Sequence, residues 1–119
     1  MIGRLRGTIA AIGEGQALVD VSGVGYLVHA GSRTLQKLTV GEPAEVFVET
    51  QMSESAIRLF AFASGEERAW FARLQDAPGV GAKIALAILD TLSLPQLMDA
   101  IALSDTTAIS RANGVGKKL

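Results

Sequence analysis

Two glycine-rich stretches carry residue types that could bind a phosphate group. The first reads Pro-Gly-Val-Gly-Ala-Lys over residues 78–83, and the second reads Asn-Gly-Val-Gly-Lys-Lys over residues 113–118. Two glycines around an apolar residue make a tight turn, and a helix that starts after such a turn has backbone N–H groups without partners in the helix. The helix dipole and a lysine add positive potential there, so the turn can hold an anion.

We therefore expect both turns to contact a nucleic-acid backbone. One Gly-x-Gly turn is a weak signal, but a repeat at a fixed spacing with a lysine in register favours phosphate binding. The alternative is a helical scaffold in which the turns are simple connections and the lysines are solvated. The expected contact residues are Gly79, Val80, Gly81, Lys83, Gly114, Val115, Gly116, Lys117 and Lys118.

The elements that would position these turns fall into two groups, because the spacing of apolar residues changes from strand-like to helical at residue 64. Residues 2–63 alternate in short runs between turns, which predicts five strands and a small β barrel, with the oligonucleotide-binding (OB) type favoured. A short helical turn capped by Ser32 is expected within it. Residues 64–119 have apolar side chains at helical spacing. The predicted fold class is a β barrel, 1–63, followed by an all-α domain, 64–119.

The helices of the second part have recognisable starts. Ser64 and Glu67 form a capping box for the first helix. The second helix is predicted over residues 82–92, Ser93 caps the third, and Asp105 caps a fourth that leads into the second glycine turn. A helix matching 82–92 should follow that turn, but only its first residues are present. We therefore expect a chain whose second helix-hairpin-helix unit is truncated.

Several classes of site are excluded or disfavoured by composition. The chain has no cysteine, which excludes disulfides, thiolate metal sites and cysteine nucleophiles. Neither glycine turn fits a Walker phosphate loop, which needs four residues between its glycines and a hydroxyl after the lysine. The single histidine, His29, is expected to pack in a strand. We therefore expect no catalytic residue, metal or cofactor.

Charge and hydropathy narrow the expected partners. The net charge of −1 argues against a generally basic nucleic-acid binder, so any binding surface must be local. No apolar run approaches the roughly 18–20 residues that a membrane-spanning helix needs. The first residues alternate between charged and apolar types too early for a signal peptide. We expect a cytoplasmic protein without a membrane partner.

The aromatic residues are expected in the core or at an interface. Trp70 and Phe71 lie on the first predicted helix, and Phe60 and Phe62 share one strand face, opposite the face that carries Ile57. A base-stacking platform is the alternative for both pairs, but packing is favoured.

Four motifs together resemble the RuvA family, the subunit that binds four-way DNA junctions in a bacterial branch-migration complex. They are the opening Met-Ile-Gly-Arg-Leu-Arg-Gly, Gly-Val-Gly-Tyr at 23–26, Gly-Val-Gly at 79–81 followed by Lys-Ile-Ala-Leu-Ala-Ile-Leu at 83–89, and Gly-Val-Gly-Lys-Lys at 114–118. The resemblance runs over the whole chain. It implies an N-terminal OB barrel at the core of a homotetramer and a tandem helix-hairpin-helix domain.

The resemblance also implies a function without catalysis. The protein would hold a four-way (Holliday) junction open and square for branch migration in recombination and DNA repair. ATP hydrolysis would belong to the partner RuvB, which binds through a C-terminal domain that is missing here. RuvC, the resolving nuclease, is implied as a further partner.

One turn departs from the family pattern. In the family, the turn between the last two barrel strands carries an acidic pin of two adjacent carboxylates at the centre of the junction. Here that turn reads Ser53-Glu54-Ser55, so the pin role falls to Glu54 and its field would be weakened by Ser55.

Two other classes of function remain as alternatives. A helix-hairpin-helix repair enzyme would need an acidic metal pair, or a catalytic lysine or aspartate near the second hairpin, and none is visible. A structural oligomerisation module would have no role with DNA. Binding to a four-way junction distinguishes both from the favoured interpretation.

Overall fold

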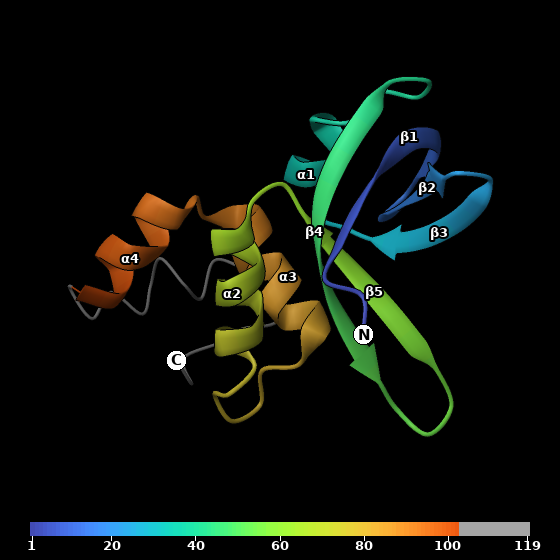
Figure 1. Ribbon diagram of the computed structural model, residues 1–119. Helices are drawn as coiled ribbons and strands as arrows, with labels where there is room; N and C mark the ends of the chain where they lie inside the picture. Colours follow the sequence, from blue (N-terminus) through green and yellow to red (C-terminus); the bar gives the residue numbers. More distant parts are fainter. Residues whose placement is uncertain (103–119) are drawn as a thin grey trace. The chain divides into compact units, whose positions relative to one another are not determined.

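The computed structural model describes residues 1–102, and the chain divides into two compact units, Met1–Arg68 and Ala69–Leu119 (Figure 1). Helix α2 (Gly65–Leu74) runs across this division. The domain boundary predicted between residues 63 and 64 therefore stays a prediction.

The first unit is a closed barrel of five strands, as predicted. The strands are β1 (Arg4–Gly13), β2 (Gln16–Val21), β3 (Val24–His29), β4 (Pro43–Met52) and β5 (Ile57–Phe62). Their order around the barrel is β1-β2-β3-β5-β4. Neighbouring strands are antiparallel except β3 and β5, which run parallel and meet at His29 and Phe60.

The alternation of apolar and polar residues builds the barrel core. Because successive strand side chains point to opposite faces, Val46 and Val48 turn inward while Glu45 beside them is exposed. Leu35 and Leu38, in and after α1 (Ser32–Gln36), pack against the core. The buried core residues are Leu5, Ile9, Ala17, Val19, Val28, Ala30, Val46, Val48, Leu59 and Ala61.

Strand β1 closes the barrel because it pairs with two strands in succession. Its first half pairs with β4 and its second half with β2, with an irregular register between Ile9 and Ala11. Gly7 lies where the partners change, and a Cβ atom there would overlap the carbonyl oxygen of Asp20. Only glycine permits this approach of the two backbones.

The prediction that Ser32 caps α1 is wrong. Gly31 takes the cap position, and its carbonyl accepts the first helical hydrogen bond from the N–H of Leu35 at 3.0 Å. Ser32 is already inside the helix. The extended backbone of Gly31 provides the turn into the helix, and no described side chain caps it.

The described part of the second unit is helical. It contains most of α2, then α3 (Ala82–Thr91) and α4 (Leu94–Ala102). The fourth helix predicted from Asp105 lies outside the described residues. Buried apolar side chains of this unit are Phe71, Leu74, Val80, Ala85, Ile88, Leu89, Leu92, Leu97 and Ala100.

His29, Phe60, Phe62 and Phe71 pack as predicted. Phe60, Phe62 and Phe71 are all buried, so none is exposed as a base-stacking platform. Trp70 is half-buried, with the Arg73 guanidinium carbon 4.8 Å from the centre of its ring system. The ring of His29 packs 5.6 Å from that of Phe60.

None of the described helices is alone long and apolar enough to cross a membrane. Helices α3 and α4 pass that test of length and composition only as a pair, and the chain bends by 101° between them.

Candidate nucleic-acid interface

The first glycine turn joins α2 to α3 and is held by the backbone and one apolar side chain. The N–H of Val80 donates to the carbonyl of Ala77 at 3.1 Å, and the Val80 side chain is buried. Gly79 has a φ of +80°, a conformation that strains residues with a Cβ atom. The Gly-Val-Gly sequence thus supplies a bend at Gly79 and an anchor at Val80.

The turn leaves the start of α3 open. Gly81 is the N-cap residue, and its carbonyl accepts the helical hydrogen bond from Ala85 at 3.0 Å. No described side chain caps this end, and the first turn of α3 has no acidic residue. The first N–H groups of α3 therefore have no side-chain acceptor within residues 1–102.

The starts of α2 and α4 differ from that of α3. Before α2, the Glu67 N–H donates to Ser64 Oγ at 3.2 Å, and the Ser64 hydroxyl donates to the Glu67 carboxylate at 3.1 Å. Before α4, the Gln96 N–H donates to Ser93 Oγ at 3.3 Å, while the Gln96 side chain accepts from the Ser93 N–H at 2.9 Å. Both predicted caps are confirmed.

The open helix start has the chemistry of an anion site. Lys83, the second residue of α3, is exposed, as is Gly81 before it. Backbone N–H groups and a lysine can together hold a phosphate oxygen, and such contacts carry no information about base sequence. The site could therefore respond to the shape of a nucleic acid but not read its bases.

The second glycine turn lies outside the described residues. The contacts expected at Gly114, Val115, Gly116, Lys117 and Lys118 stay predictions.

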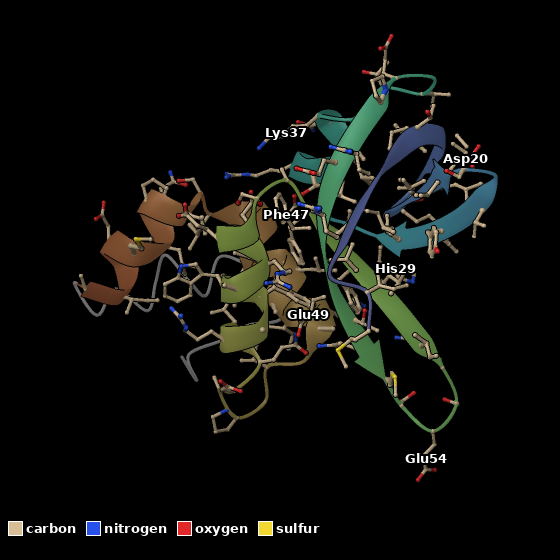
Figure 2. The ribbon with its side chains drawn as sticks, viewed as in Figure 1. Asp20, His29, Lys37, Phe47, Glu49 and Glu54 are labelled. Carbon is tan, nitrogen blue, oxygen red and sulfur yellow. The ribbon has the colours of Figure 1, made fainter. Side chains whose placement is uncertain are left out.

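Glu54 lies in the predicted position, in the turn between β4 and β5. The Ser53 N–H donates to the carbonyl of Ala56 at 2.9 Å, and the Ser53 hydroxyl donates to the same oxygen at 3.4 Å. Glu54 and Ser55 are both exposed. Figure 2 shows the Glu54 side chain at the tip of the hairpin, directed away from the barrel.

Sequence reasoning missed two residues at the same tip. Met52 and Ile57, the last residue of β4 and the first of β5, are cross-strand partners with 68% and 69% of their surface exposed. The alternating pattern put Ile57 on the face of Leu59 and Ala61. It could not show that this face leaves the core at the end of the hairpin.

The described residues offer no group of three or more histidine, aspartate or glutamate side chains that could hold a metal ion.

Both units match known families. Residues 1–61 match the family model for the RuvA N terminal domain, and residues 71–119 match that for a SAM-like helix-hairpin-helix tandem. The predicted fold class, an OB barrel followed by a tandem helix-hairpin-helix domain, is thereby confirmed.

Curated relatives align with the whole chain. Three of them are from Azorhizobium caulinodans, 53% identical, Rhizobium rhizogenes, 55% identical, and a Caulobacter species, 54% identical. Each is named Holliday junction branch migration complex subunit RuvA. All of the chain is covered in each case, but it spans only 58% or 59% of the relative's length.

Proposed function

The chain belongs to the RuvA family, and from that premise we propose that it binds four-way DNA junctions by their shape and holds them open for branch migration. The observation that carries the proposal is the uncapped start of α3, with Gly81 as cap residue and Lys83 exposed beside it. A phosphate group would replace the missing capping side chain. The second turn, 113–118, would bind a second phosphate in the same way.

The proposed assembly is a homotetramer built around the barrel. Four copies would bring eight helix-hairpin-helix turns to the four arms of a junction. Because linked weak contacts combine through effective concentration, a subunit with a net charge of −1 can still contribute to tight binding. Tight binding of this kind does not require basic residues outside the turns.

Glu54 would lie at the centre of the junction as an acidic pin. Its carboxylate is exposed at the end of a projecting hairpin, where it can repel phosphates and keep the DNA strands apart. Ser55 supplies no second charge, so this repulsion would come from one carboxylate in each subunit.

The proposed role is not enzymatic. RuvB would hydrolyse ATP and drive branch migration, binding through a further C-terminal domain of the family, and RuvC would be an additional partner that resolves the junction. Because the proposed ligand is chromosomal DNA in recombination and repair, the expected location is the bacterial cytoplasm.

The test compares a four-way junction with a duplex of equal length. The proposal predicts that the junction binds more tightly and that the affinity falls steeply with salt, because phosphate contacts release counterions. Equal affinity for both DNAs would contradict shape recognition. No binding to either would favour a structural oligomerisation module, and cleavage of the junction by the protein with magnesium would favour a repair enzyme.

A further inference from the structure

The β4–β5 hairpin ends in two different faces. Cross-strand partners point to the same side of a sheet, so Met52 and Ile57 share one face, and Gln51 and Arg58 share the other. Figure 1 shows that this hairpin extends past the other strands of the barrel. One face of the projecting tip is thus apolar and the other polar.

Burial along the apolar face stops abruptly. Leu59 and Thr50 lie on the same face, each two positions nearer the barrel along its strand. Leu59 is buried in the core. Thr50 is half-buried, and its hydroxyl donates to the carbonyl of Ile2 at 2.6 Å. Met52 and Ile57 continue the same face but are about two-thirds exposed, 68% and 69%. A single exposed apolar residue needs no explanation, but two that form a pair at a projecting tip make a small apolar surface that is available for contact.

The charge at the tip selects what this surface can contact. Glu54 is exposed in the turn that joins the pair, and Ser53 and Ser55 beside it are neutral. Arg58 is exposed on the opposite face of the tip. A phosphate approaching the apolar face would instead meet two apolar side chains with the Glu54 carboxylate beside them, which is unfavourable for an anion. The flat face of a nucleobase is uncharged and apolar, and it fits this surface. Proteins that unstack DNA use isoleucine and methionine side chains against base steps in this way.

We propose that Met52 and Ile57 contact nucleobases at the crossover of the junction and keep them unstacked. This inference rests on the proposed function, because only a bound junction brings opened base pairs to the hairpin tip. The hairpin tip then has two roles. Glu54 repels the backbones, and the apolar pair holds the bases that are released.

The test uses a four-way junction with 2-aminopurine, a base whose fluorescence rises when it is unstacked, placed at the crossover. We expect the protein to raise this fluorescence above that of the free junction. The double variant Met52→Thr/Ile57→Thr keeps strand-forming side chains at exposed positions and is expected to lose most of the rise. A matched variant, Ile12→Thr/Val40→Thr, replaces two exposed apolar residues away from the hairpin tip and should keep it.

Three results would overturn the inference. One is a rise that is unchanged in the double variant, and another is no rise at all with the original protein bound. The third is a double variant that loses its oligomeric state in light scattering while the matched variant keeps it, which would assign the apolar pair to a contact between subunits. These results differ from the one expected if the proposed function itself is wrong, in which case the original protein would bind the junction no better than duplex.

Discussion

The backbone N–H of Gln96 donates to Ser93 Oγ at 3.3 Å and closes the start of α4, whereas α3 starts at Gly81 without a side-chain cap from any described residue. A helix that lacks a cap leaves N–H groups for another acceptor. Because of this contrast between two successive helices, we place the phosphate at the start of α3. One substitution at Gly81 would introduce the missing cap.

Gly81→Ser should stabilise the fold and weaken DNA binding. A serine cap would accept a hydrogen bond from the first turn of α3, which adds a few tenths of a kcal/mol relative to glycine. The same hydroxyl would compete with phosphate for the N–H groups. Urea unfolding and fluorescence anisotropy with a labelled junction measure the two effects. A higher free energy of unfolding, which shows that the cap has formed, together with unchanged affinity would exclude the start of α3 from the DNA interface.

Gly79→Ala should lower stability by about 1–2 kcal/mol, because alanine in a left-handed conformation brings its Cβ close to the backbone. Gly81→Ala is the matched control. Gly81 has a φ of −93°, and no described atom lies within 4 Å of an added Cβ. The control has no strain from a positive φ and should lose only the smaller difference between glycine and alanine at an N-cap, roughly 0.5 kcal/mol. Equal decreases for both variants in urea unfolding would mean that the bend at Gly79 does not require glycine.

Lys83→Ala should weaken junction binding and flatten its dependence on salt. The slope of log affinity against log salt should fall in magnitude by about 0.9 for each phosphate that the protein no longer neutralises. Lys37→Ala, which removes an exposed lysine just after α1, is the control and should keep the original slope. The same change is expected for Lys118→Ala. An unchanged slope in a lysine variant would exclude that lysine from the DNA interface.

Glu54→Lys should tighten junction binding and alter branch migration when the motor is present, because a repulsive charge becomes attractive. Ser55→Asp should act in the opposite direction and weaken binding. Both effects should shrink at high salt, since exposed charges are screened over about 10 Å at 0.1 M. Glu42→Lys makes the same charge change at the other end of β4. Matching effects from Glu42→Lys and Glu54→Lys would argue against a special role for the tip.

Much of the fold was predictable because local patterns and tertiary structure agree. Alternation along β4 sorted inward from outward residues, as at Val46 and Val48, since barrel strands bury one face. Ser64 and Ser93 marked helix starts because their hydroxyls have N–H partners three residues later. Ser32 misled because Gly31 before it could adopt the cap conformation without a side chain.

The candidate site was predictable only in part. The glycine turn at 79–81 follows from its residue types, and Glu54 from its place in a turn. The exposure of Met52 and Ile57 does not, because alternation tells which face a residue is on but not how far a hairpin projects past its neighbours. Alternation alone also does not show that β5 is buried on both faces near its end, where Phe60 and Phe62 face away from Leu59 and Ala61.

The arrangement of the DNA arms in the bound state decides whether the protein holds a junction open. A junction labelled with donor and acceptor dyes on two arms folds in magnesium into stacked pairs of arms, and energy transfer reports which arms are close. At saturating protein, we expect transfer between every pair of adjacent arms to become equal, as in an open square. Arms that stay stacked in pairs while the protein is bound would contradict the proposed function.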